Sequence, residues 1–240
     1  MPTIKSLDLS ISIVSFNTKD RLRDLLSSIY KNTKKIKFEI FVVDNASKDA
    51  SVEMVRKKFP NVQLIANKKN QFFTKAQNQA LRKARGRYIL ILNSDTIISP
   101  GTLDKVITFL DRHPKIGALG IKHIYPTGAL EQTCQRLTTP WIEFLDTNIV
   151  TNTISKLRKK QFEILDYIKY ARWDRKSSRY AEAVSDACLF APRALIEKIG
   201  YYDERYLLFF TENDLCLRIR KEGYSCYHYA NAAITHVRAQ

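Results

Sequence analysis

The sequence predicts an α/β protein built on a mostly parallel central sheet, followed by a half of mixed strands and helices. Through the first 112 residues, strand-like apolar runs alternate with amphipathic helical stretches, a rhythm typical of parallel strands joined by right-handed helical crossovers. Residues 88–92 form a continuous apolar run, which is the pattern of a strand buried on both faces. The 240 residues are 45% hydrophobic, enough for one domain with a sizeable core.

The first half divides into strands and connecting helices. Strands are expected at residues 9–16, 38–43, 62–65 and 88–92, and helices at 20–30, around Val52 and Val55, and at 76–84. The first helix carries Leu22, Leu25, Leu26 and Ile29 on one face, the spacing of an amphipathic helix. Ser47 follows the second strand and is expected to cap the second helix.

The second half is less regular. A helix is expected at 102–110, a short strand at 116–121, a turn at 126–128, a candidate strand at 129–136 and strand-like structure at 183–190. Pro192 suits the start of a helix over 193–199 that Gly200 ends, because proline fits the first turn and glycine the position after the last. A final helix is expected from Asn213 to Tyr224.

The charge of the chain is strongly basic. Forty Lys and Arg stand against 24 Asp and Glu, which gives a net charge of +16. Such a balance attracts polyanions: nucleic acid, an anionic membrane surface or phosphorylated substrates. No nucleic-acid recognition motif accompanies it, and residues 15–19 do not form the glycine-rich phosphate loop of a nucleotidyltransferase. We therefore expect no nucleic-acid partner.

The location of the protein is predicted to be cytoplasmic. No stretch approaches the roughly 20 apolar residues of a membrane span, and the N-terminus lacks the apolar segment of a secretory signal. The four cysteines, Cys134, Cys188, Cys216 and Cys226, lack the close spacing of a zinc site. They are expected to be buried, reduced thiols.

A basic insertion at about 140–180 suggests contact with a membrane. Apolar residues fall near one helical face at Ile154, Leu157, Ile164, Leu165 and Ile168, with aromatic residues at Tyr167, Tyr170 and Trp173. Basic residues occupy the remainder at Lys156, Arg158, Lys159, Lys160, Lys169, Arg172, Arg175, Lys176 and Arg179. Such a segment can lie on an anionic cytoplasmic membrane face. The alternative is that its apolar face packs on the protein core.

Two acidic clusters are the chemically informative features. Asn93-Ser94-Asp95 directly follows the buried strand at 88–92, and Glu212-Asn213-Asp214 stands at the start of the last helix. A carboxylate at a strand end can hold a divalent cation, and one at a helix start can act as a base. The carboxyl ends of parallel strands form the ligand-binding edge of such a sheet. Phe16-Asn17, Asp44-Asn45 and Asn93-Ser94-Asp95 are therefore expected to converge there.

Five motifs in order resemble the family 2 glycosyltransferases, and the match is most similar to their bacterial rhamnosyltransferase-like branch. They read Ile13-Val14-Ser15-Phe16-Asn17, Val42-Val43-Asp44-Asn45-Ala46-Ser47-Lys48-Asp49, Leu92-Asn93-Ser94-Asp95-Thr96, Gly200-Tyr201-Tyr202-Asp203-Glu204-Arg205 and Glu212-Asn213-Asp214-Leu215-Cys216-Leu217-Arg218. The resemblance implies the GT-A fold, with a Rossmann-like central sheet and a mixed acceptor-side half. It implies a single domain over 1–240, with the nucleotide-sugar-binding half at about 9–112 and the acceptor and catalytic-base half at 113–240.

The resemblance also implies which residues bind the donor. Asp44 would accept a hydrogen bond from the imide nitrogen of uracil or thymine, although an Asx-type turn is the simpler role for it. Asp95 would bind Mg²⁺ or Mn²⁺ against the diphosphate, with help from His236; the family's first metal-binding acid is replaced by Asn93. Donor contacts are further assigned to Ser15, Asn17, Asn78, Asn93 and Asp186. For His236, packing in the core is an equal alternative. For Asp95 the alternative is a cap after the strand, and for Asp186 it is a turn at the end of a strand.

The catalytic base has two candidates. Glu212 matches the second acid of the family's Glu-Asp pair, Thr211 takes the place of the first, and Asp214 lies two positions on. Either Glu212 or Asp214 is therefore the expected base. Both are also residue types that the positive end of a helix dipole favours, which is the structural alternative.

The function that the resemblance implies is metal-dependent sugar transfer with inversion, of the hexosyltransferase type. The donor would be a UDP- or dTDP-sugar and the acceptor a glycan or lipid-linked hydroxyl, and the reaction would belong to cell-surface polysaccharide or glycolipid synthesis. Since Asn93 and Thr211 depart from the acidic pattern, the alternative is a catalytically inactive, nucleotide-sugar-binding module of the same fold.

Overall fold

The computed structural model describes residues 7–137, 167, 170 and 172–237. The described strands are β1 (Leu9–Ser15), β2 (Phe38–Asp44), β3 (Gln63–Ala66), β4 (Tyr88–Asn93), β5 (Thr96–Ile98), β6 (Ile116–Ile124), β7 (Cys134–Gln135), β8 (Arg179–Ala181), β9 (Ala183–Val184), β10 (Cys188–Pro192) and β11 (Ser225–His236). The described helices are α1 (Lys19–Asn32), α2 (Ser51–Lys58), α3 (Phe72–Leu81), α4 (Thr102–Arg112), α8 (Arg193–Lys198) and α9 (Thr211–Lys221). The chain is thus of the α/β class that the sequence predicts.

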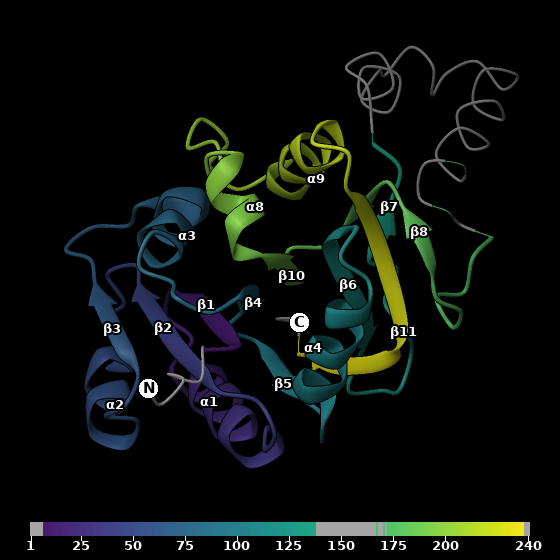
Figure 1. Ribbon diagram of the computed structural model, residues 1–240. Coiled ribbons are helices and arrows are strands. Elements are labelled where there is room, and N and C mark those ends of the chain that lie inside the picture. Colours follow the sequence, from purple (N-terminus) through teal and green to yellow (C-terminus); the bar gives the residue numbers. More distant parts are fainter. Residues whose placement is uncertain (1–6, 138–166, 168–169, 171, 238–240) are drawn as a thin grey trace, which may run out of the picture.

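One large sheet runs through both halves of the chain (Figure 1). In the described residues its strand order is β3-β2-β1-β4-β10-β6-β11-β5, with β8 beside β11. The first four strands are parallel, and so are β6 and β11. Strand β10 is antiparallel to both β4 and β6, so it joins the two parallel blocks into one sheet.

Helices cover both faces of the sheet (Figure 1). One core contains Leu90 and Leu92 of β4 together with residues of α1, α2 and α4. The other contains Ile89 and Ile91 of the same strand, with residues of α3, α8 and α9. Because successive side chains of a strand point to opposite faces, a continuous apolar run supplies both cores.

The expected elements of the first half are present with shifted ends. The helix expected at 76–84 is α3 and begins at Phe72, where the Asn70 side-chain oxygen accepts the Phe72 N–H at 2.8 Å. The expected cap by Ser47 is wrong. Helix α2 begins at Ser51, and Ser47 Oγ instead accepts the backbone N–H of Asn17 at 2.9 Å.

Two strand predictions in the second half are corrected. The candidate strand at 129–136 is reduced to a bridge at Leu130 and the short β7. The strand-like stretch at 183–190 is two strands, β9 and β10, separated by a turn at 185–187. In this turn the Ala187 N–H donates to Ser185 Oγ at 3.3 Å, so Asp186 lies on a bend rather than in a strand.

Strand β11 was not expected from the sequence. Its buried and less buried positions alternate over twelve residues, as in a strand with one buried face. The buried positions include Ala230, His228 and His236, so little apolar alternation marks the strand. The last helix, α9, begins at Thr211, two residues earlier than expected.

The membrane hypothesis for 140–180 lies largely outside the described residues, and its described part needs a correction. Tyr170 and Trp173 are buried, and Arg175 is 1% exposed. The Arg175 guanidinium donates to the backbone oxygens of Tyr170 and Cys134 at 2.7 and 3.0 Å. These three side chains belong to the protein interior rather than to an interfacial face.

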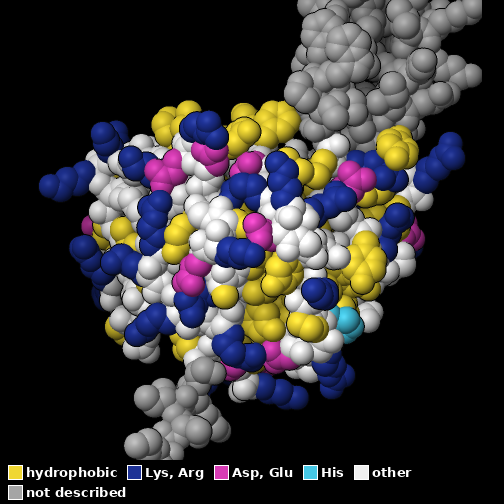
Figure 2. Space-filling view, turned by 45° about the horizontal axis from the view of Figure 1, so that its top comes forward, with side chains coloured by type: hydrophobic (Ala, Val, Ile, Leu, Met, Phe, Trp, Pro, Cys, Tyr) yellow, Lys and Arg dark blue, Asp and Glu magenta, His cyan; other side chains and the backbone are white. Residues whose placement is uncertain are grey.

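The described surface is basic but mixed. Lys and Arg side chains are spread over the face seen in Figure 2, with acidic side chains among them. Within the described ranges, no helix combines the length and apolar character needed to cross a bilayer. The four cysteines are buried free thiols, as expected.

Candidate functional site

The carboxyl ends of β1, β2 and β4 meet at one edge of the sheet, as expected. Strand pairing places Ser15 beside Asp44 and Val14 beside Asn93. A cavity of about 360 Å³ opens here, and we call it the edge cavity. It is lined by Val14, Phe16, Thr18, Asn45, Asn70, Phe72, Phe73, Asn93, Ser94, Asp95 and Leu208.

Asp44 ends β2 and is 2% exposed. Its Oδ2 accepts the backbone N–H of Ser47 at 2.9 Å, which is the turn contact expected of such a residue. Its Oδ1 is buried without a hydrogen-bond partner in the described structure. A buried carboxylate oxygen strongly favours a hydrogen-bond donor. The turn role therefore leaves one oxygen of Asp44 available for a ligand.

Ser15 and Asn17 shape the loops of the same edge. Ser15 Oγ lies 2.9 Å from Thr18 Oγ1, which in turn donates to Ser94 Oγ at 3.0 Å. Asn17 has a left-handed backbone with φ of 54°, and its side-chain oxygen accepts the Lys48 N–H at 2.8 Å. Both residues connect the segments that surround the edge cavity.

Asp95 and His236 are brought together from distant parts of the chain. Asp95 follows β4 and lines the edge cavity, while His236 ends β11. His236 Nε2 lies 3.3 Å from Asp95 Oδ1, and the Val237 N–H donates to the Asp95 backbone oxygen at 2.7 Å. His236 is therefore packed in the interior, as the alternative expected, and it also contacts Asp95, the predicted metal-binding acid.

The other side of His236 faces a second carboxylate. His236 Nδ1 lies 2.7 Å from Glu131 Oε2, and His123 Nδ1 lies 3.3 Å from the same oxygen. Burial alone would lower the pKa of His236, but its contacts with Asp95 and Glu131 outweigh burial and raise the pKa to about 9. Burial alone would raise the pKa of Glu131, but the two histidines hold that pKa well below its usual range.

The Asp95 and His236 atoms fit one divalent cation. Two neighbouring ligands at about 2.1 Å from an octahedral ion stand about 3 Å apart. The observed separation between Asp95 Oδ1 and His236 Nε2 is 3.3 Å, so a small displacement admits a shared ion. Asn93, at the end of β4, adds an amide oxygen to the wall of the same cavity.

A second cavity, of about 240 Å³, contains the predicted base, and we call it the Glu212 cavity. It is lined by Glu131, Gln132, Thr133, Cys134, Gln135, Val184, Ser185 and Glu212. Gln135 donates from its amide to the Asn213 side-chain oxygen at 2.8 Å, which links β7 to the start of α9. Most of the lining is polar, as suits a hydroxylated ligand.

Asp186 and Glu212 form an acidic pair joined by Thr211. The Thr211 hydroxyl lies 2.6 Å from Asp186 Oδ2 and 3.3 Å from Glu212 Oε2. Burial and the negative charge of Glu212 raise the pKa of the Asp186 carboxyl well above its ordinary value. Two carboxylates in one site share protons in this way because like charges repel. Perturbed carboxyls of this kind gather at functional sites.

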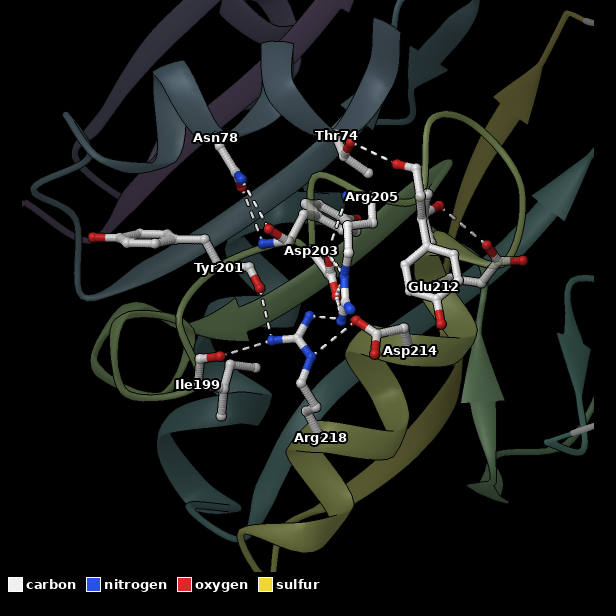
Figure 3. Close-up of polar contacts among 12 residues, drawn as sticks. Thr74, Asn78, Ile199, Tyr201, Asp203, Arg205, Glu212, Asp214 and Arg218 are labelled. Carbon is white, nitrogen blue, oxygen red and sulfur yellow. Dashed lines mark hydrogen bonds and ion pairs between the residues drawn. The ribbon is translucent and has the colours of Figure 1, made fainter.

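Asp214 has a different environment from Glu212 (Figure 3). Its Oδ2 accepts from Arg218 Nε and a terminal nitrogen of Arg218 at 2.9 and 2.6 Å. Arg218 also donates to the backbone oxygens of Ile199 and Tyr201 at 2.8 and 2.7 Å. Asp214 thus anchors the arginine that holds the segment after α8, whereas Glu212 faces the Glu212 cavity.

Asn78 is fully buried and satisfied by protein groups (Figure 3). Its amide nitrogen donates to the Tyr202 backbone oxygen at 2.9 Å and to Glu204 Oε1 at 3.0 Å. Its side-chain oxygen accepts the Tyr202 N–H at 3.0 Å. These contacts fix the loop after α8 and turn Asn78 away from solvent, so we do not include it among the donor contacts proposed below.

Sequence reasoning missed two residues of the site, Glu131 and His123, and it missed the bridging role of Thr211. His123 pairs with Ile234 across β6 and β11, and Glu131 follows β6 by a short loop. No local motif marks either residue, since only the pairing of two distant strands brings them to His236. Thr211 was visible as a substitution at an acidic position, but its two carboxylate contacts depend on the bend at Asp186.

Comparisons with known proteins match this architecture. An L-rhamnosyltransferase of Mycobacterium tuberculosis that acts on N-acetylglucosaminyl-diphospho-decaprenol is 21% identical over 96% of this chain and 76% of that protein. The structure of mannosyltransferase PcManGT from Pyrobaculum calidifontis with GDP-Man and Mn²⁺ superposes with a TM-score of 0.67 at 17% identity, over 99% of this chain and 59% of that one. GalNAc-T7 with UDP, GalNAc and Mn²⁺ gives 0.70 at 14% identity, over 98% and 44%.

The structural likenesses establish a GT-A fold, and this chain spans about 60% or less of the solved chains that it resembles here. The model of the family named Glycosyl transferase family 2 matches residues 10–179, which contain the strands and loops of the edge cavity up to Asp95. That range covers well over half of the chain and includes Asp44, Asp95 and Glu131. The chain belongs to glycosyl transferase family 2.

Proposed function

We propose that this protein is an inverting, metal-dependent glycosyltransferase that moves a sugar from a UDP- or dTDP-sugar to an acceptor hydroxyl. The proposal is carried by the adjacency of a metal-binding pair and a carboxylate base. Asp95 lines the edge cavity and Glu212 lines the Glu212 cavity. Contacts of 3.3 and 2.7 Å lead from Asp95 through His236 to Glu131, which lines the second cavity. A donor diphosphate and an acceptor would therefore be held side by side.

The leaving group would be held at the edge cavity. Asp95 and His236 are the proposed metal ligands, and Asn93 is a neutral neighbour at the end of β4. A bound Mn²⁺ or Mg²⁺ ion would supply positive charge that stabilises the departing diphosphate. The imidazole nitrogen in the pair favours Mn²⁺, because Mg²⁺ takes oxygen ligands.

Glu212 is the proposed general base. Its carboxylate would take the proton of the acceptor hydroxyl while the hydroxyl oxygen attacks the anomeric carbon and the bond to the diphosphate breaks. This single displacement inverts the anomeric configuration, and general-base assistance contributes about 10² to 10⁴ in rate. Asp186, with its raised pKa, would hold a proton beside Glu212. Asp214 is assigned no chemical step because Arg218 occupies its Oδ2.

The choice of nucleotide is assigned to Asp44. Its unpartnered Oδ1 is an acceptor to which the imide N–H of uracil or thymine would donate. Ser15 and Asn17 would support this end of the site by holding its loops. The donor contacts that we propose are thus made by Asp44, Asn93 and Asp186.

The acceptor is proposed to be a glycan or a lipid-linked sugar in cell-surface polysaccharide or glycolipid synthesis. The mycobacterial relative supports this choice, because its name gives a sugar linked to diphospho-decaprenol as the molecule that it acts on. The polar lining of the Glu212 cavity suits a sugar hydroxyl.

The basic insertion at about 140–180 is proposed to attach the protein to an anionic cytoplasmic membrane face. The net charge of +16 supports it. The test is sedimentation with vesicles of neutral and anionic lipid. Binding should require anionic lipid, weaken in high salt and fall in the triple variant Arg158→Glu, Lys159→Glu, Lys160→Glu. Unchanged binding of that variant would refute the proposal.

The test of the activity is release of nucleoside diphosphate from UDP-, dTDP- and GDP-sugars, measured with Mn²⁺ and with EDTA. We expect release from a UDP- or dTDP-sugar that requires the metal and is lost in Glu212→Gln. Metal-dependent nucleotide binding with no release from any donor, alone or with glycan acceptors, would favour the inactive binding module instead.

A further inference from the structure

Glu131 lies at the centre of the site, but no contact with the sugar donor or with the sugar acceptor is assigned to it. Its Oε2 lies 2.7 Å from His236 Nδ1 and 3.3 Å from His123 Nδ1. The three side chains are 5%, 4% and 1% exposed, respectively. A carboxylate placed so deeply is costly unless charged or hydrogen-bonded groups surround it, so its partners determine its role.

The two ring nitrogens of His236 face opposite carboxylates. Nε2 lies 3.3 Å from Asp95 at the edge cavity, and Nδ1 lies 2.7 Å from Glu131. An imidazole can bind a metal through Nε2 only if that nitrogen offers its lone pair, which requires the remaining proton to sit on Nδ1. Glu131, as a hydrogen-bond acceptor, stabilises this tautomer and fixes the plane of the ring.

The backbone holds Glu131 in place. Its N–H donates to the His123 backbone oxygen at 2.9 Å. His123 in β6 pairs with Ile234 in β11, two positions before His236. The rings of His123 and His236 are almost perpendicular, with centroids 5.6 Å apart. Glu131 therefore lies in the loop after β6, where its backbone is tied to His123 beside β11.

We propose that Glu131 is a positioning residue, which holds His236 with Nε2 directed at the metal site, and that His123 holds Glu131 in turn. The inference rests on the metal-dependent transfer proposed above, since it concerns the ion that Asp95 and His236 would share. The arrangement places the metal site and the Glu212 cavity on either side of one histidine, because Glu131 also lines that cavity.

The alternative is that the same three side chains form a metal site in their own right, because their ligand atoms all lie within 4.8 Å of one another. The distances favour the positioning role. The 2.7 Å between Glu131 Oε2 and His236 Nδ1 is typical of a charge-assisted hydrogen bond, and the other nitrogen of the same ring faces Asp95 at 3.3 Å.

The test measures Mn²⁺ coordination rather than turnover. Mn²⁺ affinity is determined by calorimetry with saturating UDP, and imidazole coordination is detected as ¹⁴N modulation in pulsed electron paramagnetic resonance of the bound Mn²⁺. The variants are Glu131→Gln, which removes the charge, and Glu131→Met, which removes the acceptor at similar volume. The control is Glu182→Gln, since the Glu182 carboxylate accepts from Arg136 and from the Leu137 N–H and is not among the contacts of His236.

The wild type and Glu182→Gln should give strong nitrogen modulation. Glu131→Gln should bind Mn²⁺ about 10- to 100-fold more weakly than the wild type, and Glu131→Met should bind it more weakly still. Both variants should lose the nitrogen modulation. Their UDP affinity in EDTA should change less than about twofold. If folded Glu131→Gln kept wild-type Mn²⁺ affinity and modulation, the inference about Glu131 would be overturned, but the proposed function would not. If Glu131→Gln fails to fold, the same result in Glu131→Met decides. If UDP binding by the wild type did not depend on Mn²⁺, the proposed metal dependence itself would be overturned. Two bound Mn²⁺ ions per chain would support a separate metal site at His123, Glu131 and His236 and contradict the positioning role.

Discussion

Glu212 and Asp214 stand two positions apart in α9, yet their side chains contact different partners. Glu212 lies beside Thr211 and lines a cavity, while Asp214 is paired with Arg218. We expect Glu212→Gln to lower turnover at least about 100-fold, because the amide cannot take the acceptor proton. Nucleotide affinity should be nearly unchanged, since the side chain lines the Glu212 cavity rather than the edge cavity. Steady-state kinetics and calorimetry of UDP binding measure the two effects.

Asp214→Asn is the matched comparison at the same helix start. Loss of the charge opposite Arg218 should lower the free energy of unfolding by about 1–3 kcal/mol and leave the pH profile of turnover unchanged. If Asp214→Asn abolished turnover in a folded protein and Glu212→Gln remained active, the assignment of the base would pass to Asp214.

Asp186 makes a prediction about stability and pH. Its pKa is raised to about 7 by burial and by the charge of Glu212. As pH rises from about 4 to 7, the unfolded chain loses this proton while the folded protein keeps it, so the free energy of unfolding falls. Asp186→Asn removes the dependence. Urea unfolding at pH 4.5 and 7 should therefore give a larger stability for the variant relative to wild type at the higher pH; parallel curves for the two proteins would contradict this.

At the scale of elements, the turn before β4 packs directly against β1. A Cβ added at Gly86 would lie 2.5 Å from the Ser10 nitrogen and 2.6 Å from the Leu9 carbonyl carbon. The Gly86 N–H also donates to Ser10 Oγ at 2.8 Å. Backbone atoms cannot yield as a flexible side chain can, so Gly86→Ala should cost about 2–4 kcal/mol of stability.

Gly101→Ala is the control for this prediction. Gly101 has φ of 68° and no atom within 4 Å of an added Cβ, so the cost should be only the backbone strain of about 1 kcal/mol. Thermal or urea unfolding of both variants measures the difference. Equal losses in the two variants would mean that the close approach of the turn to β1 is not important.

The elements that could be predicted are those with a clear apolar period. Strands β1, β2 and β4 and helices α1 and α4 follow runs or faces of Leu, Ile and Val that bury completely. Strand β11 was missed because His228, Ala230 and His236 occupy buried positions where apolar residues are expected. A turn at Asp186 was weighed from the sequence, but the division of 183–190 into β9 and β10 was not expected, since alanines and Val184 on both sides read as one strand.

At the scale of the whole molecule, the sheet brings distant sites together. The carboxyl ends of parallel strands predicted that Phe16-Asn17, Asp44-Asn45 and Asn93-Ser94-Asp95 converge at one edge, and the pairing of β1 with β2 and β4 confirms it. Long-range pairing of β6 with β11 brings His123 near His236, which local sequence patterns cannot reveal. The roles of the site residues stay predictions until they are measured.

The most direct test of the account is UDP binding by calorimetry with Mn²⁺ and with EDTA. Because Asp95 and His236 converge at the edge cavity, Mn²⁺ should strengthen binding by at least about tenfold, or about 1.4 kcal/mol. Asp95→Ala should abolish the gain, while Asp20→Ala, which makes the same change of charge at an exposed position of α1, should retain it. Equal UDP affinity of the wild type in Mn²⁺ and in EDTA would contradict the account.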